Sequence, residues 1–148
     1  MTRHGTVLAL SISARKGTQK ANVPAATFVA AWGIDGDAHA GAGHRQVSLL
    51  AIESFATMRD RGATVAPGQF AENITTAGLV LADLPIGTRL AVGEVVLEVT
   101  QIGKVCHQHC AIFHQVGDCV MPREGIFARV LTGGTVQVGE TIIVLDAG

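Results

Sequence analysis

Short apolar segments that alternate with polar or glycine-rich stretches dominate the chain and predict β-strands. The first is Thr6–Ser13 (TVLALSIS), and the next is Val47–Leu50, after a basic loop closed by Pro24 and a glycine-rich loop. The segment 66–85 (APGQFAENITTAGLVLADLP) has the pattern of a turn, a short strand and a turn. Aliphatic and β-branched residues in short runs suit pleated strands, so we expect many strands and few helices.

One segment has helical rather than strand periodicity. Ile52, Phe55, Ala56 and Met58 recur at the spacing of one helix face in AIESFATMRDRG, and Gly62 follows as a stop signal. We therefore predict a helix that ends near Gly62.

A strand–turn–strand pattern occurs twice in the second half of the chain. Gly87–Val99 (GTRLAVGEVVLEV) and Gly134–Leu145 (GTVQVGETIIVL) each contain a Val-Gly-Glu turn between two apolar segments. We predict two β-hairpins of the same type, with Gly93 and Gly139 in left-handed conformations that a side chain disfavours. No linker divides the chain, so residues 1–148 are expected to form a single domain: mainly β, an antiparallel β-barrel with one or two short helices.

Composition narrows the class of function. Of the 148 residues, 48% are hydrophobic and 16% charged, which supplies a core and excludes disorder, and the formal net charge of −1 implies no bulk attraction to nucleic acid or to an anionic membrane. The apolar run Val7–Leu10 is too short for a signal-peptide core or a membrane span, so we expect a cytoplasmic protein. In a reducing cytosol its cysteines should be thiols, ligands or catalysts.

All three cysteines and three of the six histidines lie in Gly103–Cys119 (GKVCHQHCAIFHQVGDC). A zinc site formed by Cys106, Cys110 and a histidine or Cys119 is one interpretation, although no second pair of ligands at knuckle spacing follows. A second interpretation is that the cysteines are buried as small hydrophobic residues. This suits Cys110 and Cys119, which have apolar neighbours.

Cys106 differs because it follows a predicted strand and stands between Lys104 and His107. Positive charge from these neighbours would favour the thiolate, which is the reactive and metal-binding form. The alternative is that Lys104 points to solvent and Cys106 is buried, and local chemistry leaves both open.

Three further clusters carry polar chemistry. The glycine-rich loop GIDGDAHAGAGHRQ brings together acidic, histidine and arginine side chains without the spacing of a calcium or phosphate loop, and its aspartates could equally cap turns. Arginines there and near residue 123, together with Lys104, could line a pocket for an anionic ligand, or could be unrelated surface charges. Glu72 and Asn73 in PGQFAENIT could contact a ligand or hold their own loop. The members of the first two clusters are Asp35, Asp37, His39, His44, Arg45, Arg123 and Arg129.

Five motifs in this order resemble a MOSC domain, the domain at the C-terminus of molybdenum cofactor sulfurase, and in particular its small bacterial versions. They are GIDGDAHAG, HRQVSLL, PGQFAENITTAGL, IGTRLAVGEVVLEVTQIGKVCHQHC and MPREGIFARVLTGG. The resemblance implies a barrel-like β fold and a link to the molybdenum cofactor, a pterin with a dithiolene and a phosphate. It singles out Cys106, which would carry sulfur as a persulfide or ligate molybdenum, with Lys104 and His107 beside it. The residues expected to hold the cofactor are Arg45, Arg123, Arg129, His44 and Asn73.

The resemblance also defines what the chain would need from others. It has no aminotransferase-like domain with a pyridoxal-phosphate lysine, so a cysteine desulfurase or another donor would supply sulfur and a molybdoenzyme would accept it. The usual FGEN motif is FAEN here, with Ala71 at the glycine position. Three hypotheses follow: a sulfur-carrier or cofactor-binding module, a zinc-stabilised binding protein, and a reductase component that needs an external electron donor.

Overall fold

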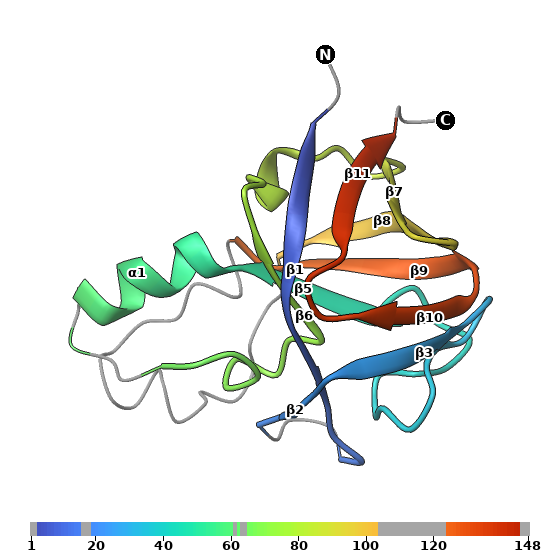
Figure 1. Cartoon of the computed structure of the whole chain (residues 1–148), viewed down its shortest axis with the longest axis horizontal. Helices are drawn as coiled ribbons and strands as arrows, with labels where there is room; N and C mark the ends of the chain where they lie inside the picture. Colours follow the sequence, from blue (N-terminus) through green and yellow to red (C-terminus); the bar gives the residue numbers. More distant parts are fainter. Residues whose placement is uncertain (1–2, 16–18, 61, 63–64, 104–123, 146–148) are drawn as a thin grey trace.

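Strands make up most of the secondary structure of the computed structural model, which describes residues 3–15, 19–60, 62, 65–103 and 124–145 (Figure 1). One α-helix and one short 3-10 helix are present among these residues. In chain order the elements are β1 (His4–Ile12), β2 (Ala21–Val23), β3 (Ala25–Val29), β4 (Gly33–Ile34), β5 (Val47–Ala51), α1 (Ile52–Asp60), β6 (Ile74–Ala77), η1 (Leu81–Asp83), β7 (Arg89–Val92), β8 (Val95–Ile102), β9 (Ile126–Thr132), β10 (Gly134–Gln137) and β11 (Thr141–Leu145).

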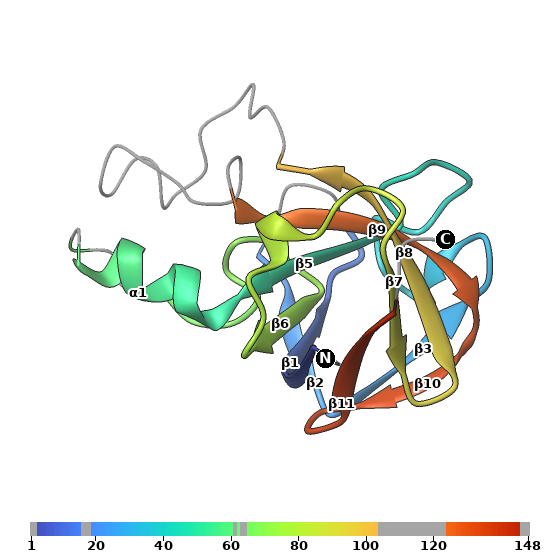
Figure 2. The same cartoon turned by 90° about the horizontal axis from the view of Figure 1, so that it is seen from above.

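Seven strands form a closed barrel in the order β11-β7-β8-β9-β5-β6-β1 (Figure 2). The ring closes because β1 pairs with β6 along one edge and its first part pairs with β11 along the other, with His4 opposite Ile143. The later part of β1 pairs with β2, which is not part of the ring. A separate three-stranded sheet has the order β10-β3-β4. The predicted mainly β barrel with a short helix is therefore confirmed.

One neighbouring pair in the barrel is parallel, β5 with β6, whereas the sequence predicted an antiparallel barrel. The helix α1 lies between these two strands in the chain. Parallel neighbours need a long crossover connection, usually helical, and the segment from α1 to Asn73 supplies it. The predicted helix is confirmed at Ile52–Asp60, with Gly62 just beyond its end.

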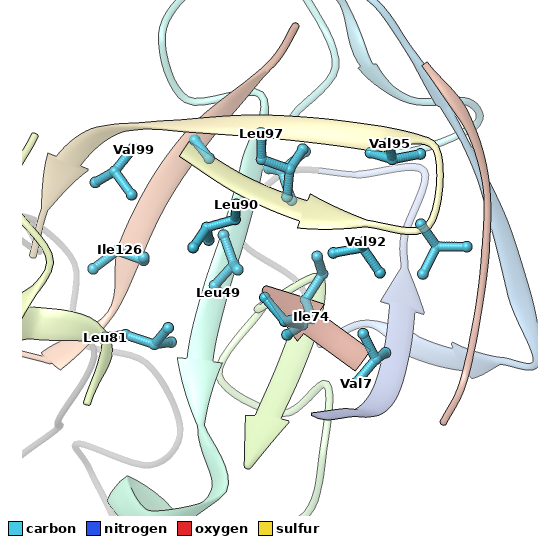
Figure 3. Packing of buried hydrophobic residues seen from close by; sticks show 14 of the residues in the cluster. Val7, Leu49, Ile74, Leu81, Leu90, Val92, Val95, Leu97, Val99 and Ile126 are labelled. Carbon is cyan, nitrogen blue, oxygen red and sulfur yellow. The ribbon is translucent and has the colours of Figure 1, made fainter. Parts of the chain in front are cut away.

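The barrel interior holds the main hydrophobic core (Figure 3). Along β8, Val95, Leu97 and Val99 point inward and are buried, as the period of two in a strand requires. A second apolar cluster lies outside the barrel and joins α1 to β5 and β9; its members are Leu50, Phe55, Met58, Val65, Phe70 and Phe127. Strand β5 is buried on both faces because it separates these two clusters.

Only the first of the two Val-Gly-Glu turns joins strands that pair with each other. Gly93 has φ 59° and joins β7 to β8 as a true hairpin. Gly139 has φ 97°, but the strands on either side of it do not pair with each other, so the second predicted hairpin is wrong. Here the turn hydrogen-bonds to β1: the Gly139 amide donates to the Val7 carbonyl (2.8 Å) and the Val7 amide to the Glu140 carbonyl (2.9 Å). β10 therefore pairs with β3, and β11 joins the barrel.

Candidate functional site

A pocket of about 480 Å³ lies between the glycine-rich loop after β4 and the side chain of Phe127 on β9. Its volume is within the range of small-molecule sites. A Cβ atom built on Gly41 or Gly43 would meet open space, so the loop backbone is accessible from the pocket. The lining residues are His39, Ala40, Gly41, Ala42, Gly43, His44, Arg45 and Phe127.

Buried polar side chains hold both ends of this loop. At its start, Asp37 accepts hydrogen bonds from the Ser13 amide (3.0 Å), the His39 amide (2.9 Å) and the Lys20 ammonium group (2.8 Å). At its end, Gln46 donates to the Gly43 carbonyl (3.1 Å) and accepts from the Val130 amide (3.0 Å). A glycine-rich loop has much conformational freedom to lose, so these contacts define its shape.

The ion pair between Lys20 and Asp37 is almost sealed from water, with 1% and 0% of the two side chains exposed. Burial opposes ionisation of Asp37, but the hydrogen bonds from Lys20, His39 and Ser13 and the charge of Lys20 outweigh it and lower the pKa of this carboxyl group. Asp37 is thus ionised at neutral pH. It is an anchor of the loop, in agreement with the turn-capping alternative raised for the aspartates.

His39 projects from the loop against three groups. Its Nδ1 atom is 3.4 Å from Asn73 Oδ1 and 3.7 Å from Asp37 Oδ2, and its ring meets Phe127 edge-on, with centroids 6.2 Å apart. Within the described residues no three histidine, cysteine, aspartate or glutamate side chains are grouped as metal ligands would be.

Arg45 and His44 also line the pocket, and the sequence had predicted both as ligand-binding residues. The Arg45 guanidinium lies over the Phe127 ring at 5.4 Å, a cation–π arrangement. Its Nε donates to Gln101 Oε1 (2.9 Å), which also lies 2.7 Å from His44 Nε2. The structure therefore brings these two predicted residues together and adds two that the sequence analysis missed, Gln101 and Phe127.

Asn73, also predicted to bind the cofactor, is completely buried. Its Oδ1 accepts hydrogen bonds from the Ser48 amide (2.9 Å) and hydroxyl (3.2 Å), and its Nδ2 donates to the Ser11 carbonyl (3.1 Å). It connects β1, β5 and β6 and reaches the pocket through its contact with His39.

Glu72 stabilises its own loop by hydrogen bonds, which is one of the two roles that the sequence left open for it. The fully buried carboxylate accepts from the Gly68 amide (2.9 Å), the Phe70 amide (3.2 Å) and the Thr75 hydroxyl (2.7 Å). Burial raises the pKa of Glu72 despite these hydrogen bonds. Ala71, at the unusual position in FAEN, has φ 61°, the left-handed conformation that glycine adopts more easily.

Arg129 lies away from the pocket lining. Its Nη2 is 2.7 Å from Glu98 Oε1, on the outer surface of β8 and β9, and Arg89 lies 3.8 Å from the other oxygen of the same carboxylate. The structure thus places Arg129 in a surface ion-pair network, and a role in cofactor binding stays a prediction.

The remaining predicted residues, Lys104, Cys106, His107 and Arg123, lie outside the described residues, as do Cys110 and Cys119. The described chain stops at Gly103 and resumes at Glu124, and the Gly103 amide donates to the Gly125 carbonyl (2.6 Å). Gly103 is next to the pocket, because its carbonyl accepts a hydrogen bond from Gln101 Nε2 (2.8 Å).

With this geometry established, comparison with known proteins identifies the family. The family model of the MOSC domain matches residues 35–143, which include the glycine-rich loop and the barrel strands around it. The chain belongs to the MOSC domain family. No curated protein matches the sequence closely enough to count as a relative.

Solved structures share the MOSC fold at low sequence identity. The YuaD protein from Bacillus subtilis superposes with a TM-score of 0.81 at 21% identity, over 97% of this chain and 98% of its own. YiiM from Geobacillus stearothermophilus gives a TM-score of 0.73 at 20% identity, over 96% and 75% of the two chains. YiiM from Escherichia coli gives 0.67 at 18% identity, over 99% and 70%. These likenesses show the fold.

Membership in the MOSC family associates the chain in general terms with the biology of the molybdenum cofactor. No helix in the described part of the chain has the length and hydropathy to cross a membrane.

Proposed function

We propose that the pocket binds the molybdenum cofactor and that Cys106 carries sulfur as a persulfide or ligates molybdenum. The observation that carries this proposal is the position of Arg45, which lines the pocket and is held there by Gln101 and Phe127. Gln101 is in β8 and hydrogen-bonds to Gly103, the residue that follows this strand. Cys106 is three residues beyond Gly103. Covalent geometry therefore keeps the two Cα atoms within about 11 Å of each other.

The residues present suit such a ligand. The pocket is large enough for a small organic molecule, and the loop backbone at Gly41 and Gly43 leaves open space beside it. Arginine binds phosphate through paired hydrogen bonds, and an aromatic ring such as that of Phe127 adds apolar surface. Arg45 and His44 are the described residues that would hold the anionic part of the cofactor.

The cofactor and the protein would contribute different chemical groups. When bound, the cofactor supplies the dithiolene sulfur atoms and the molybdenum centre. The chain supplies the thiolate of Cys106, which the positive charges of Lys104 and His107 would favour. In sulfur carriage this thiolate attacks the outer sulfur of a donor persulfide; the donor S–S bond breaks, Cys106 becomes a persulfide and the donor leaves as a thiolate.

Cofactor binding is tested by isolating the protein from a host that makes the cofactor and measuring molybdenum and pterin. We expect both at near-stoichiometric amounts in the wild-type protein and a marked loss in Arg45→Met. Arg89→Met is the matched control, since Arg89 is half-exposed and paired with Glu98 away from the pocket. Absence of molybdenum and pterin from the wild-type protein would contradict cofactor binding.

Sulfur carriage is tested by incubation with a cysteine desulfurase and cysteine, followed by mass spectrometry. We expect the mass of one added sulfur atom on Cys106, lost in Cys106→Ser and retained in Cys119→Ser. A gain that persists in Cys106→Ser would show that the sulfur goes elsewhere. Zinc analysis of the same samples tests the alternative of a zinc-stabilised binding protein, which predicts near-stoichiometric metal and unfolding on chelation.

A further inference from the structure

Gln101 has no assigned role, yet its side chain is at the centre of the polar contacts beside the pocket. The amide oxygen contacts Arg45 Nε at 2.9 Å and His44 Nε2 at 2.7 Å, and the amide nitrogen donates to the Gly103 carbonyl at 2.8 Å. One side chain thus connects two pocket-lining residues to the end of β8.

An irregularity in β8 directs Gln101 toward two residues that line the pocket, His44 and Arg45. In a regular strand Gln101 would follow Val95, Leu97 and Val99 into the barrel interior. The pairing with β9 shifts between Val99 and Gln101, so Gln101 lies opposite Phe127. Such an irregularity redirects the side chains that follow it. Thr100 at this position donates its hydroxyl hydrogen to the His44 carbonyl and ties the loop to the same point.

The amide of Gln101 can adopt only one orientation. Arg45 Nε–H is always a donor, and the Gly103 carbonyl is always an acceptor, so the oxygen must face Arg45 and the nitrogen must face Gly103. The same oxygen faces His44 Nε2, and that nitrogen must therefore carry a proton. In the neutral imidazole, Nδ1 of His44 then has a free lone pair.

The hydrogen bond to Nε also fixes how Arg45 is presented. With the guanidinium stacked on Phe127 and Nε occupied, the outer edge formed by Nη1 and Nη2 has no hydrogen-bond partner among the described residues. That edge provides two parallel N–H donors, the arrangement that matches the oxygens of a phosphate or carboxylate.

We propose that Gln101 is a positioning residue that sets the ligand specificity of the pocket, by fixing Arg45 as a two-donor fork for an oxyanion and His44 as its Nε2–H tautomer. The pocket then selects a ligand that carries a phosphate-like oxyanion next to an N–H or O–H donor for His44 Nδ1. The ligand-binding half of this inference rests on the proposed function, while the orientation of Gln101, Arg45 and His44 exists without ligand.

The first experiment measures the tautomer of His44 by ¹⁵N NMR of the ligand-free protein at alkaline pH, where imidazole is neutral. We expect the Nε2–H form in the wild-type protein and in Gln101→Glu, whose carboxylate still accepts from both partners. In Gln101→Leu we expect a mixture of tautomers. The Nδ1–H form in the wild-type protein, or an unchanged tautomer in Gln101→Leu, overturns the inference. A purely structural role for Gln101 would not produce this difference between the two variants.

The second experiment measures binding of inorganic phosphate by calorimetry. Loss of a hydrogen bond that orients a charged group predicts about tenfold weaker binding in Gln101→Leu. Gln137→Leu is the matched control on an exposed strand position and should bind as the wild-type protein does. Equal affinity in Gln101→Leu and the wild-type protein, with both folded by circular dichroism, overturns the inference, and so does failure of the wild-type protein to bind phosphate. Neither result changes the molybdenum and pterin content that tests the proposed function, so the two failures are distinguishable.

Discussion

Replacing Lys20 by methionine tests how strongly the buried ion pair beneath the glycine-rich loop stabilises the protein. Lys20 Nζ and Asp37 Oδ1 are 2.8 Å apart, and the two side chains are 1% and 0% exposed. Methionine preserves most of the length and apolar volume of lysine but removes its charge. The carboxylate of Asp37 would then keep the Ser13 and His39 amides as hydrogen-bond donors and lose its countercharge.

Removing one partner of a buried ion pair typically costs about 3–5 kcal/mol, because an uncompensated charge stays in the interior. The two remaining amide hydrogen bonds place Lys20→Met at the lower end, at about 3 kcal/mol of unfolding free energy. The double variant Lys20→Met/Asp37→Asn contains no buried charge at this site. It should therefore lose about 2 kcal/mol less than the sum of the two single variants.

The assay is equilibrium unfolding in urea at neutral pH, with the slopes compared to confirm two-state behaviour. Arg129→Met is the matched control: its ion pair with Glu98 is about as short at 2.7 Å, but the arginine is 51% exposed. An exposed pair contributes under about 1 kcal/mol. The reasoning is refuted if Lys20→Met costs no more than Arg129→Met, or if the effects of the two single variants simply add.

Three further predictions concern the turn before β6 and its carboxylate. Ala71→Gly relieves the left-handed backbone at φ 61° and should raise the unfolding free energy by about 0.5–1 kcal/mol, measured in urea. Gly68→Ala places a Cβ against the Lys20 carbonyl, well inside van der Waals contact, at φ 94°, so we expect a loss of at least about 2 kcal/mol in the same measurement. Burial raises the pKa of Glu72, so the folded protein holds that proton more tightly than the unfolded chain does. Stability should therefore fall as pH rises above the ordinary value of 4.5, and Glu72→Gln should lack this part of the pH dependence. An equal slope in wild type and Glu72→Gln would contradict the assignment.

The local pattern of the sequence predicted most elements of the barrel, because each strand carries its own apolar alternation. The strand at Val47, the helix at Ile52 and the turn at Gly93 all lie where the pattern placed them. Pairing was harder to predict. Nothing local to Gly139 indicates that the turn hydrogen-bonds to Val7 at the other end of the chain, or that β6 pairs in parallel with β5.

The sequence predicted some residues of the candidate site and missed others. Residue type suggested Arg45 as part of an anion pocket, and the resemblance to the MOSC domain named Arg45 and His44 as cofactor-holding residues. Gln101 was missed, although a polar residue at the inward phase of VVLEVTQI was a visible signal of an irregular strand. Phe127 was missed because an aromatic residue in an apolar strand normally indicates core packing, and here it has both roles.

The pairing of β1 with β11 sets an order of events during synthesis. Residues at the N-terminal end of the ring, such as His4, meet their partner at Ile143 only when nearly the whole chain has left the ribosome. Contacts between such distant segments slow folding, since a long loop of chain must close before they form. Until then the edges of β1 and β7 that pair with β11 stay open to other chains, so nascent chains that stall before β11 should be the ones that chaperones must shield.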